Sequence, residues 1–103
     1  MKTLHIAVVD KIATYQQKDG EIVCGNNDCV IEFAFDSEWD KCPDKVARFI
    51  INDSYIDVSF SGTTCPVPVI RNATVIGVGV YVSNLCATTV ANIKCKKSIL
   101  CMS

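Results

Sequence analysis

Seven cysteines are the most reactive side chains of this 103-residue chain, because a thiolate can serve as a nucleophile, a metal ligand or half of a disulfide. They are Cys24, Cys29, Cys42, Cys65, Cys86, Cys95 and Cys101. An odd number cannot pair completely within one chain. Three of them (Cys29, Cys65 and Cys95) stand where a strand pattern calls for a small apolar residue, which favours buried free thiols. A disulfide formed on exposure to air is the alternative.

A zinc site is conceivable from Cys24-x4-Cys29 together with Cys95-x5-Cys101. However, the sequence has no C-x2-C pair, and the single histidine, His5, has no partner at ligand spacing. We therefore expect no bound metal.

An acidic corner offers oxygen ligands, since Asp36, Glu38 and Asp40 alternate like the opening of a calcium loop. An EF-hand is excluded because its sixth position would be Lys41 instead of glycine and its twelfth Ala47 instead of glutamate. The corner is expected to be a solvated cluster that caps a turn, with a weak cation site as the alternative.

The sequence contains no convincing motif for catalysis or for cofactor binding. A catalytic triad would have to use His5, which lies between Leu4 and Ile6 on a strand and is expected to face solvent. Gly77-x-Gly79 lacks the third glycine and the following helix of a dinucleotide loop. We predict a protein that is not an enzyme, with no catalytic, cofactor-binding or metal-binding residues.

Composition limits the partners. Half of the residues are apolar, 20% are charged and the net charge is −1, so no basic face is available for nucleic acid. No apolar run approaches the length of a membrane helix, and Asp10 and Lys11 interrupt the N-terminal apolar residues before a signal peptide could form. The sequence predicts one domain, residues 1–103, synthesised in the cytoplasm.

The rest of the chain is organised around residues 29–40, which alternate and then end at the acidic corner. The alternation places Cys29, Ile31, Phe33 and Phe35 on one face of a strand. We expect Trp39 to plug a core walled by Phe33, Phe35 and Phe49. A second strand follows after Pro43, and the two strands are expected to form a hairpin.

Other short strands are expected at residues 3–9, 21–24, 45–51, 55–60, 73–83, 86–95 and 98–102, with an edge strand or connector at 65–69 and a loop or irregular arm at 10–20. About eight strands at this spacing predict an all-β, antiparallel β-sandwich or small barrel. In the strand at 73–83 one face carries the core residues Ile76, Val78 and Val80. The other face carries Gly77, Gly79 and Tyr81, where a neighbour or a partner is expected to approach closely.

The motif I-E-F-A-F-D-S-E-W-D at 31–40, followed by K-V-A-R-F at 45–49, resembles the F-x-F-x-x-E-W-D and K-x-A-x-F signature of small β domains in tailed-phage structural proteins. C-P-V-P at 65–68, T-V-I-G-V-G-V-Y at 74–81 and the stretch from A-T-T-V-A at 87–91 to K-S-I-L at 97–100 also resemble that group. The resemblance covers residues 28–100 and leaves 1–27 as an N-terminal strand and arm. It departs at the cysteines and at K-C-P-D (41–44), where the group has a glycine-containing turn.

This resemblance implies an immunoglobulin-like or related sandwich and a non-enzymatic virion protein made in the bacterial cytoplasm. Because no trimerising stem is visible, we expect an auxiliary or decoration protein that stabilises the capsid surface. Its partners would be the major capsid protein or other virion proteins, with self-association possible and neither nucleic acid nor membrane involved. A head-fibre or baseplate component is the first alternative. A carbohydrate-binding sandwich that uses Trp39 or Tyr81 as a stacking platform is the second.

Overall fold

The structure, a computed structural model, describes residues 2–25, 28–83 and 86–97, and these residues form strands joined by turns and two short 3-10 helices. The all-β prediction is confirmed. The elements are β1 (Lys2–Val9), β2 (Ile12–Tyr15), η1 (Gln17–Asp19), β3 (Ile22–Val23), β4 (Cys29–Phe35), η2 (Ser37–Trp39), β5 (Asp44–Ile51), β6 (Ser54–Ser61), β7 (Thr64–Pro66), β8 (Val75–Val82), β9 (Cys86–Ala87) and β10 (Ala91–Lys96).

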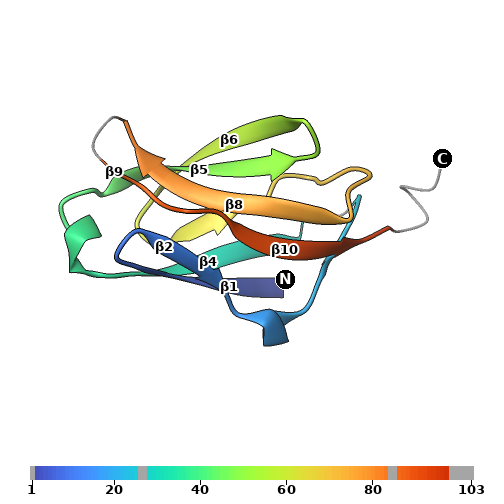
Figure 1. Ribbon diagram of the computed structural model, residues 1–103, viewed down its shortest axis with the longest axis horizontal. Coiled ribbons are helices and arrows are strands. Elements are labelled where there is room, and N and C mark those ends of the chain that lie inside the picture. Colours follow the sequence, from blue (N-terminus) through green and yellow to red (C-terminus); the bar gives the residue numbers. More distant parts are fainter. Residues whose placement is uncertain (1, 26–27, 84–85, 98–103) are drawn as a thin grey trace.

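The strands form two sheets, one of which curls into a half-barrel (Figure 1). The four-stranded sheet has the order β2-β1-β4-β7, and the six-stranded sheet has the order β3-β10-β8-β5-β6, with β9 paired to β8. The expectation of a wholly antiparallel fold is wrong, because β1 pairs with β4 and β10 pairs with β3 in parallel. The described residues also form ten strands, where about eight were expected.

Two predicted boundaries change. Residues 10–20, expected as a loop or arm, contain β2 and η1. The chain reverses between β1 and β2 at Asp10 and Lys11, whose φ angles of 52° and 64° give the left-handed turn that suits a tight hairpin. The strand expected at 86–95 is divided into β9 and β10. The strand expected at 98–102 lies outside the described residues.

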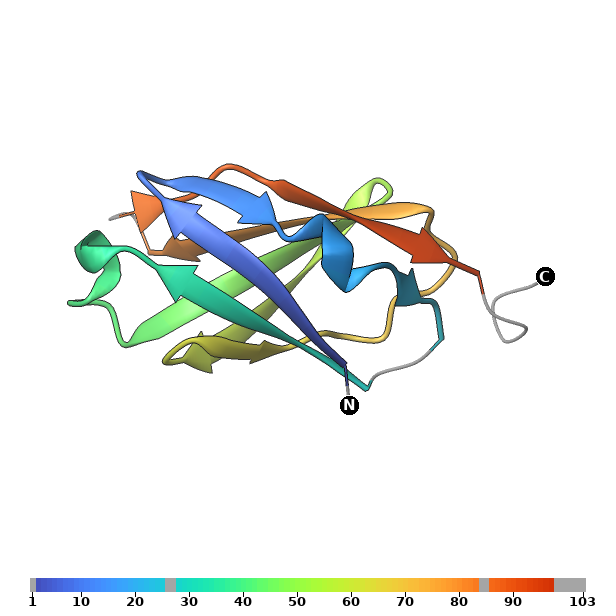
Figure 2. The ribbon, with the colours of Figure 1, turned by 90° about the horizontal axis from the view of Figure 1, so that it is seen from below.

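The two strands of the central stretch lie in different sheets, so the expected hairpin is wrong. β4 belongs to the four-stranded sheet and β5 to the six-stranded sheet. The chain passes from one sheet to the other through the 3-10 turn of η2, at one end of the molecule (Figure 2). The alternating pattern was correctly interpreted, but alternation does not specify which neighbour a strand pairs with.

The core between the sheets contains the predicted residues. Trp39 is 2% exposed, Phe33 2% and Phe49 0%. The core face of β8 is also buried, at Ile76, Val78 and Val80, while Phe35 is partly buried and packs against the core. The rings form a continuous row: centroids are 5.2 Å apart for Trp39–Phe35, 5.2 Å for Phe35–Phe33 and 5.4 Å for Phe33–Phe60.

Candidate interaction surface

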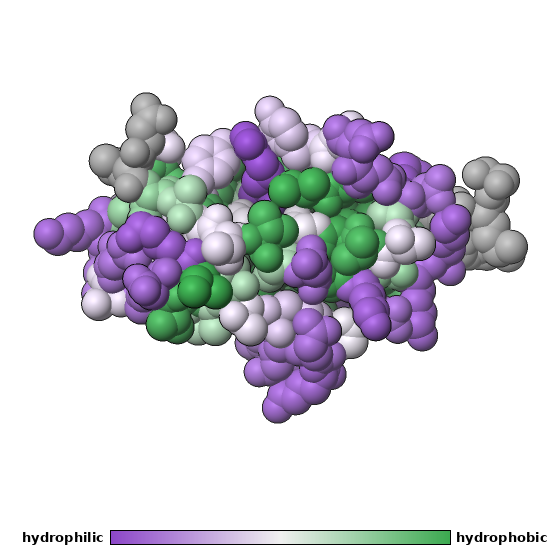
Figure 3. All heavy atoms as spheres, viewed as in Figure 1, coloured by the Kyte–Doolittle hydropathy of each residue, from purple (hydrophilic) through white to green (hydrophobic). Residues whose placement is uncertain are grey.

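An apolar patch occupies the outer face of the six-stranded sheet. In the space-filling view, hydrophobic side chains gather over the middle of β8 and β10, with hydrophilic side chains around them (Figure 3). Ile50 is 37% exposed, Val75 46% and Val90 45%. Ile50 and Val90 both line two shallow hollows of about 280 and 250 Å³. Neighbouring exposed apolar side chains beside concave surface are typical of a protein-binding face.

Gly77 and Gly79 lie beneath this patch. A Cβ built on Gly77 would lie 2.5 Å from Val90 Cγ1, and one on Gly79 would lie 3.4 Å from Thr88 Oγ1. The predicted close approach to this face is thus present, and it is made by the chain's own residues 88–90. Gly77 is buried by this contact, whereas Gly79 and Tyr81 remain partly exposed.

Residues 88–90, here called the strap, hold the patch in place. The Thr88 N–H donates to the Val80 carbonyl at 2.9 Å, and the Val80 N–H donates to Thr88 Oγ1 at 3.0 Å. Thr89 connects to the β1–β2 hairpin: its N–H donates to the Lys11 carbonyl at 2.8 Å, and its hydroxyl accepts from the Ala13 N–H at 3.1 Å. The strap is therefore hydrogen-bonded both to β8 and to the β1–β2 hairpin, and this holds the backbone next to Val90 in place.

Tyr81 belongs to a polar and aromatic cluster beside the patch. Arg48 Nε and a second guanidinium nitrogen donate to the two carboxylate oxygens of Asp57 at 2.8 and 3.0 Å. The Tyr81 hydroxyl donates to Asp57 Oδ2 at 2.9 Å. The guanidinium carbon of Arg48 lies 3.9 Å from the ring centroid of Tyr55 and 5.2 Å from that of Tyr81. Such a bidentate, stacked arginine is already ordered before any partner binds.

These contacts shift the ionisation of the cluster. Its hydrogen bonds from Arg48 lower the pKa of Asp57, and the bond to Asp57 raises the pKa of Tyr81. The hydrogen bonds that Arg48 itself donates to Asp57 raise the pKa of Arg48. At neutral pH Asp57 is therefore a carboxylate, Arg48 a guanidinium cation and Tyr81 a neutral phenol.

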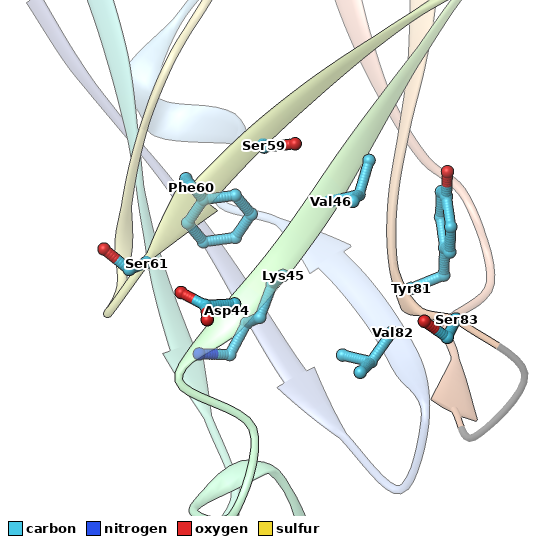
Figure 4. A pocket seen from close by; sticks show the side chains of 9 residues that line it. All are labelled: Asp44, Lys45, Val46, Ser59, Phe60, Ser61, Tyr81, Val82 and Ser83. Carbon is cyan, nitrogen blue, oxygen red and sulfur yellow. The ribbon is translucent and has the colours of Figure 1, made fainter.

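A third hollow, of about 450 Å³, lies at the end of the sheet near the acidic corner (Figure 4). Phe60 and Lys45 lie close together on the β6 side of it, and Tyr81 and Val82 line it from β8. Lys45 is only 5% exposed. Its ammonium group lies 4.9 Å from the centroid of Phe35 and donates to the Gly62 carbonyl at 2.9 Å. The hydrogen bond and the ring contact stabilise the buried ammonium group, so Lys45 has a structural role.

The acidic corner is occupied with contacts inside the protein. Asp36 Oδ2 accepts from the Asp10 N–H at 2.8 Å, and Lys11 Nζ lies 2.7 Å from Glu38 Oε2. Two of the three carboxylates thus contact the β1–β2 turn. The expected solvated, turn-capping cluster is found only in part, because Asp36 is partly buried and makes no capping hydrogen bond to η2. No group of three or more metal-binding side chains occurs among the described residues.

Cys29, Cys42, Cys65, Cys86 and Cys95 of the described ranges are free thiols. Cys24, Cys29, Cys65 and Cys95 are buried, which confirms the prediction for the last three, while Cys42 and Cys86 are partly exposed. The proposed fourth zinc ligand, Cys101, lies outside the described residues.

His5 faces solvent, as expected. Its Nδ1 lies 3.0 Å from Asp19 Oδ2. Although desolvation opposes it, hydrogen bonding from His5, with help from Gln16, holds the pKa of Asp19 below its ordinary value.

The sequence interpretation missed the roles of Arg48, Asp57 and Val90. The first two could have been found, because the turn at 52–53 places Arg48 opposite Asp57 in the β5–β6 hairpin. Val90 carries no such local signal, since its contact with Gly77 depends on the path of the strap.

No helix in the described ranges has the length and hydropathy of a membrane span. Comparison of the chain with family models, curated proteins and solved structures finds no match in any of the three. The structural observation that bears on function is therefore the outer surface of the six-stranded sheet.

Proposed function

We propose that this protein is a non-enzymatic virion structural protein, with an immunoglobulin-like or related sandwich, that binds the capsid surface as an auxiliary or decoration protein. The observation that carries the proposal is the apolar patch formed by Ile50, Val75 and Val90 on the outer face of the six-stranded sheet. Apolar side chains on a stiff sheet suit a partner that is itself a folded protein surface. The phage resemblance of residues 28–100 supports a capsid as that partner.

The patch and its neighbouring cluster are suited to repeated weak binding. Arg48 and Tyr81 are held by Asp57, so little side-chain entropy is lost when a partner covers them. A patch of this size would bury only a small interface area in a single complex, so one copy alone would bind weakly. On a capsid, copies bound at equivalent positions would each cover a junction between subunits, and a linked pair of copies would gain by avidity.

A carbohydrate-binding function is less well supported by the same geometry. Trp39, the strongest candidate for stacking on a sugar ring, is buried in the core row of aromatic rings. Tyr81 donates its hydroxyl to Asp57 and has Arg48 near its ring. A head-fibre or baseplate role would use the same patch on a different part of the particle.

Co-sedimentation with purified shells that lack the protein tests the proposal. Ile50→Asp places a charge in the centre of the patch and is expected to weaken binding by about tenfold or more. Ala34→Asp is the matched control, because Ala34 is an exposed apolar residue on the outer face of the other sheet. It is expected to bind like the wild type. Equal binding by both variants, or no binding by the wild type, would contradict the proposal.

A further inference from the structure

The outer edge of β6 differs from the other sheet edges. β6 is eight residues long and pairs with β5, and nothing in the described part of the chain pairs with its other side. The remaining edges are short or covered: β3 has two residues, β7 has three and ends at Pro66, and Ala13 of β2 is bonded to the strap. Proteins protect long free edges with lysine, proline or bulges. The β6 sequence contains neither lysine nor proline.

The backbone geometry identifies the free groups. The two-residue turn at 52–53 makes Ile51 and Ser54 the closing hydrogen-bonded pair of the β5–β6 hairpin. Every second residue from Ser54 onward therefore directs its backbone N–H and C=O toward β5. The intervening residues direct theirs outward, and they are Tyr55, Asp57, Ser59 and Ser61. An edge of this kind accepts an extended strand and no other backbone conformation.

The chemistry of β6 favours a second copy of itself as that strand. Asp57 is its one charged side chain, and Arg48 neutralises it. Antiparallel pairing centred on Val58 brings Val58 against its own copy and Ile56 against the partner's Phe60 on the core side. On the outer side it places Asp57 opposite the partner's Ser59, and Tyr55 opposite the partner's Ser61. Ile56, which is 41% exposed, gains an apolar neighbour in this arrangement.

The alternative registers are poorer. Centring on Asp57 places two aspartates directly opposite each other, which is destabilising. Centring the pairing on Ile56 leaves fewer residues of the two β6 strands opposite each other. The Val58 register keeps residues 55–61 paired and allows about eight hydrogen bonds between the strands.

We infer that this protein forms a twofold dimer through antiparallel pairing of β6 with β6 of a second copy. The inference stands apart from the proposed function, because it concerns the free protein in solution. Because the new contact is one strand edge, we expect a dissociation constant in the roughly micromolar range.

Sedimentation velocity over a concentration series, with a reductant that keeps the thiols apart, tests the dimer. Ser59→Asp puts a carboxylate opposite the partner's Asp57 at each of the two equivalent positions and is expected to weaken dimerisation by about tenfold or more. Ser59→Lys is the matched control, because a lysine there meets Asp57 and leaves the dimer at least as tight. Ser59→Pro removes an outward N–H and is expected to leave a monomer.

Circular dichroism and thermal melting establish that each variant is folded. If the proline variant does not fold, the comparison between the aspartate and lysine variants decides. A monomer up to about millimolar concentration would overturn the inference. Equal association of Ser59→Asp and Ser59→Lys would also overturn it, because the oligomer would then use another surface.

Discussion

Gly77 occupies the tightest point on the outer face of β8, where a Cβ would lie 2.5 Å from Val90 Cγ1. Gly77→Ala is expected to destabilise the protein by about 1–3 kcal/mol, because the strap is tied by hydrogen bonds at Thr88 and Thr89 and cannot move away freely. Urea denaturation followed by Trp39 fluorescence measures the change in the free energy of unfolding.

Gly79→Ala is the control for that experiment, since its Cβ would meet its nearest atoms at an ordinary 3.4 Å. It is expected to be neutral or slightly stabilising, because alanine suits a strand better than glycine. Adding Val90→Ala to Gly77→Ala should recover part of the lost stability. A Gly77→Ala variant as stable as the wild type would show that the strap yields easily.

The buried thiols make stability sensitive to alkaline pH. Burial raises the pKa of Cys65 to about 12 and that of Cys95 to about 12, against an ordinary value of 9.0. Above pH 9 the unfolded chain loses these protons while the folded chain keeps them, so the free energy of unfolding falls as pH rises from 9 toward 12. Each thiol contributes a slope of up to about 1.4 kcal/mol per pH unit.

Urea denaturation at pH 7 to 11 checks this expectation. Cys65→Ala should show a shallower decline than the wild type, even though removing a buried side chain lowers its starting stability. A free energy of unfolding that stays constant from pH 8 to 11 would contradict the buried, protonated state of these thiols.

At the scale of elements, the β1–β2 hairpin depends on the acidic corner. Asp36 accepts from the Asp10 N–H, and both turn residues, Asp10 and Lys11, have positive φ. Asp36→Ala is expected to cost about 1–2 kcal/mol, because it removes the partner of a turn N–H and loosens the hairpin. Asp36→Asn keeps an acceptor and should cost less.

Glu38→Gln is the control for the same corner. Its ion pair with Lys11 is exposed to solvent, so its loss is expected to change stability little. Thermal melting ranks the three variants. If Asp36→Ala has the melting temperature of the wild type while Glu38→Gln lowers it, the turn is stabilised by the ion pair between Glu38 and Lys11 and not by the hydrogen bond to Asp36.

The sequence allowed the faces of most strands to be predicted, but not their partners. Alternation identified the buried side of β4 and β8 correctly, because a period of two depends only on burial. The same alternation is compatible with parallel and antiparallel pairing, so the β1–β4 pair could not be foreseen. β2 was missed because Asp10-Lys11 is not a typical residue pair for a left-handed hairpin turn. Lys45 was not recognised as buried, because lysine is rarely so without a local partner.

At the scale of the whole molecule, the proposed patch and the inferred dimer are geometrically compatible. The twofold axis of an antiparallel edge pair is perpendicular to the sheet, so both outer faces point to the same side. A dimer would therefore present two patches formed around Ile50 and Val90 to one surface. Bivalent attachment strengthens binding without any new contact at either patch.

Cryo-microscopy of particles purified from cells that carry this gene tests the central claim most directly. The account predicts copies of this two-sheet domain on the head, with the outer face of the six-stranded sheet and Ile50 against the shell. Particles that lack the protein would contradict it. So would bound copies that expose Ile50 to solvent and contact the shell through the outer face of the four-stranded sheet.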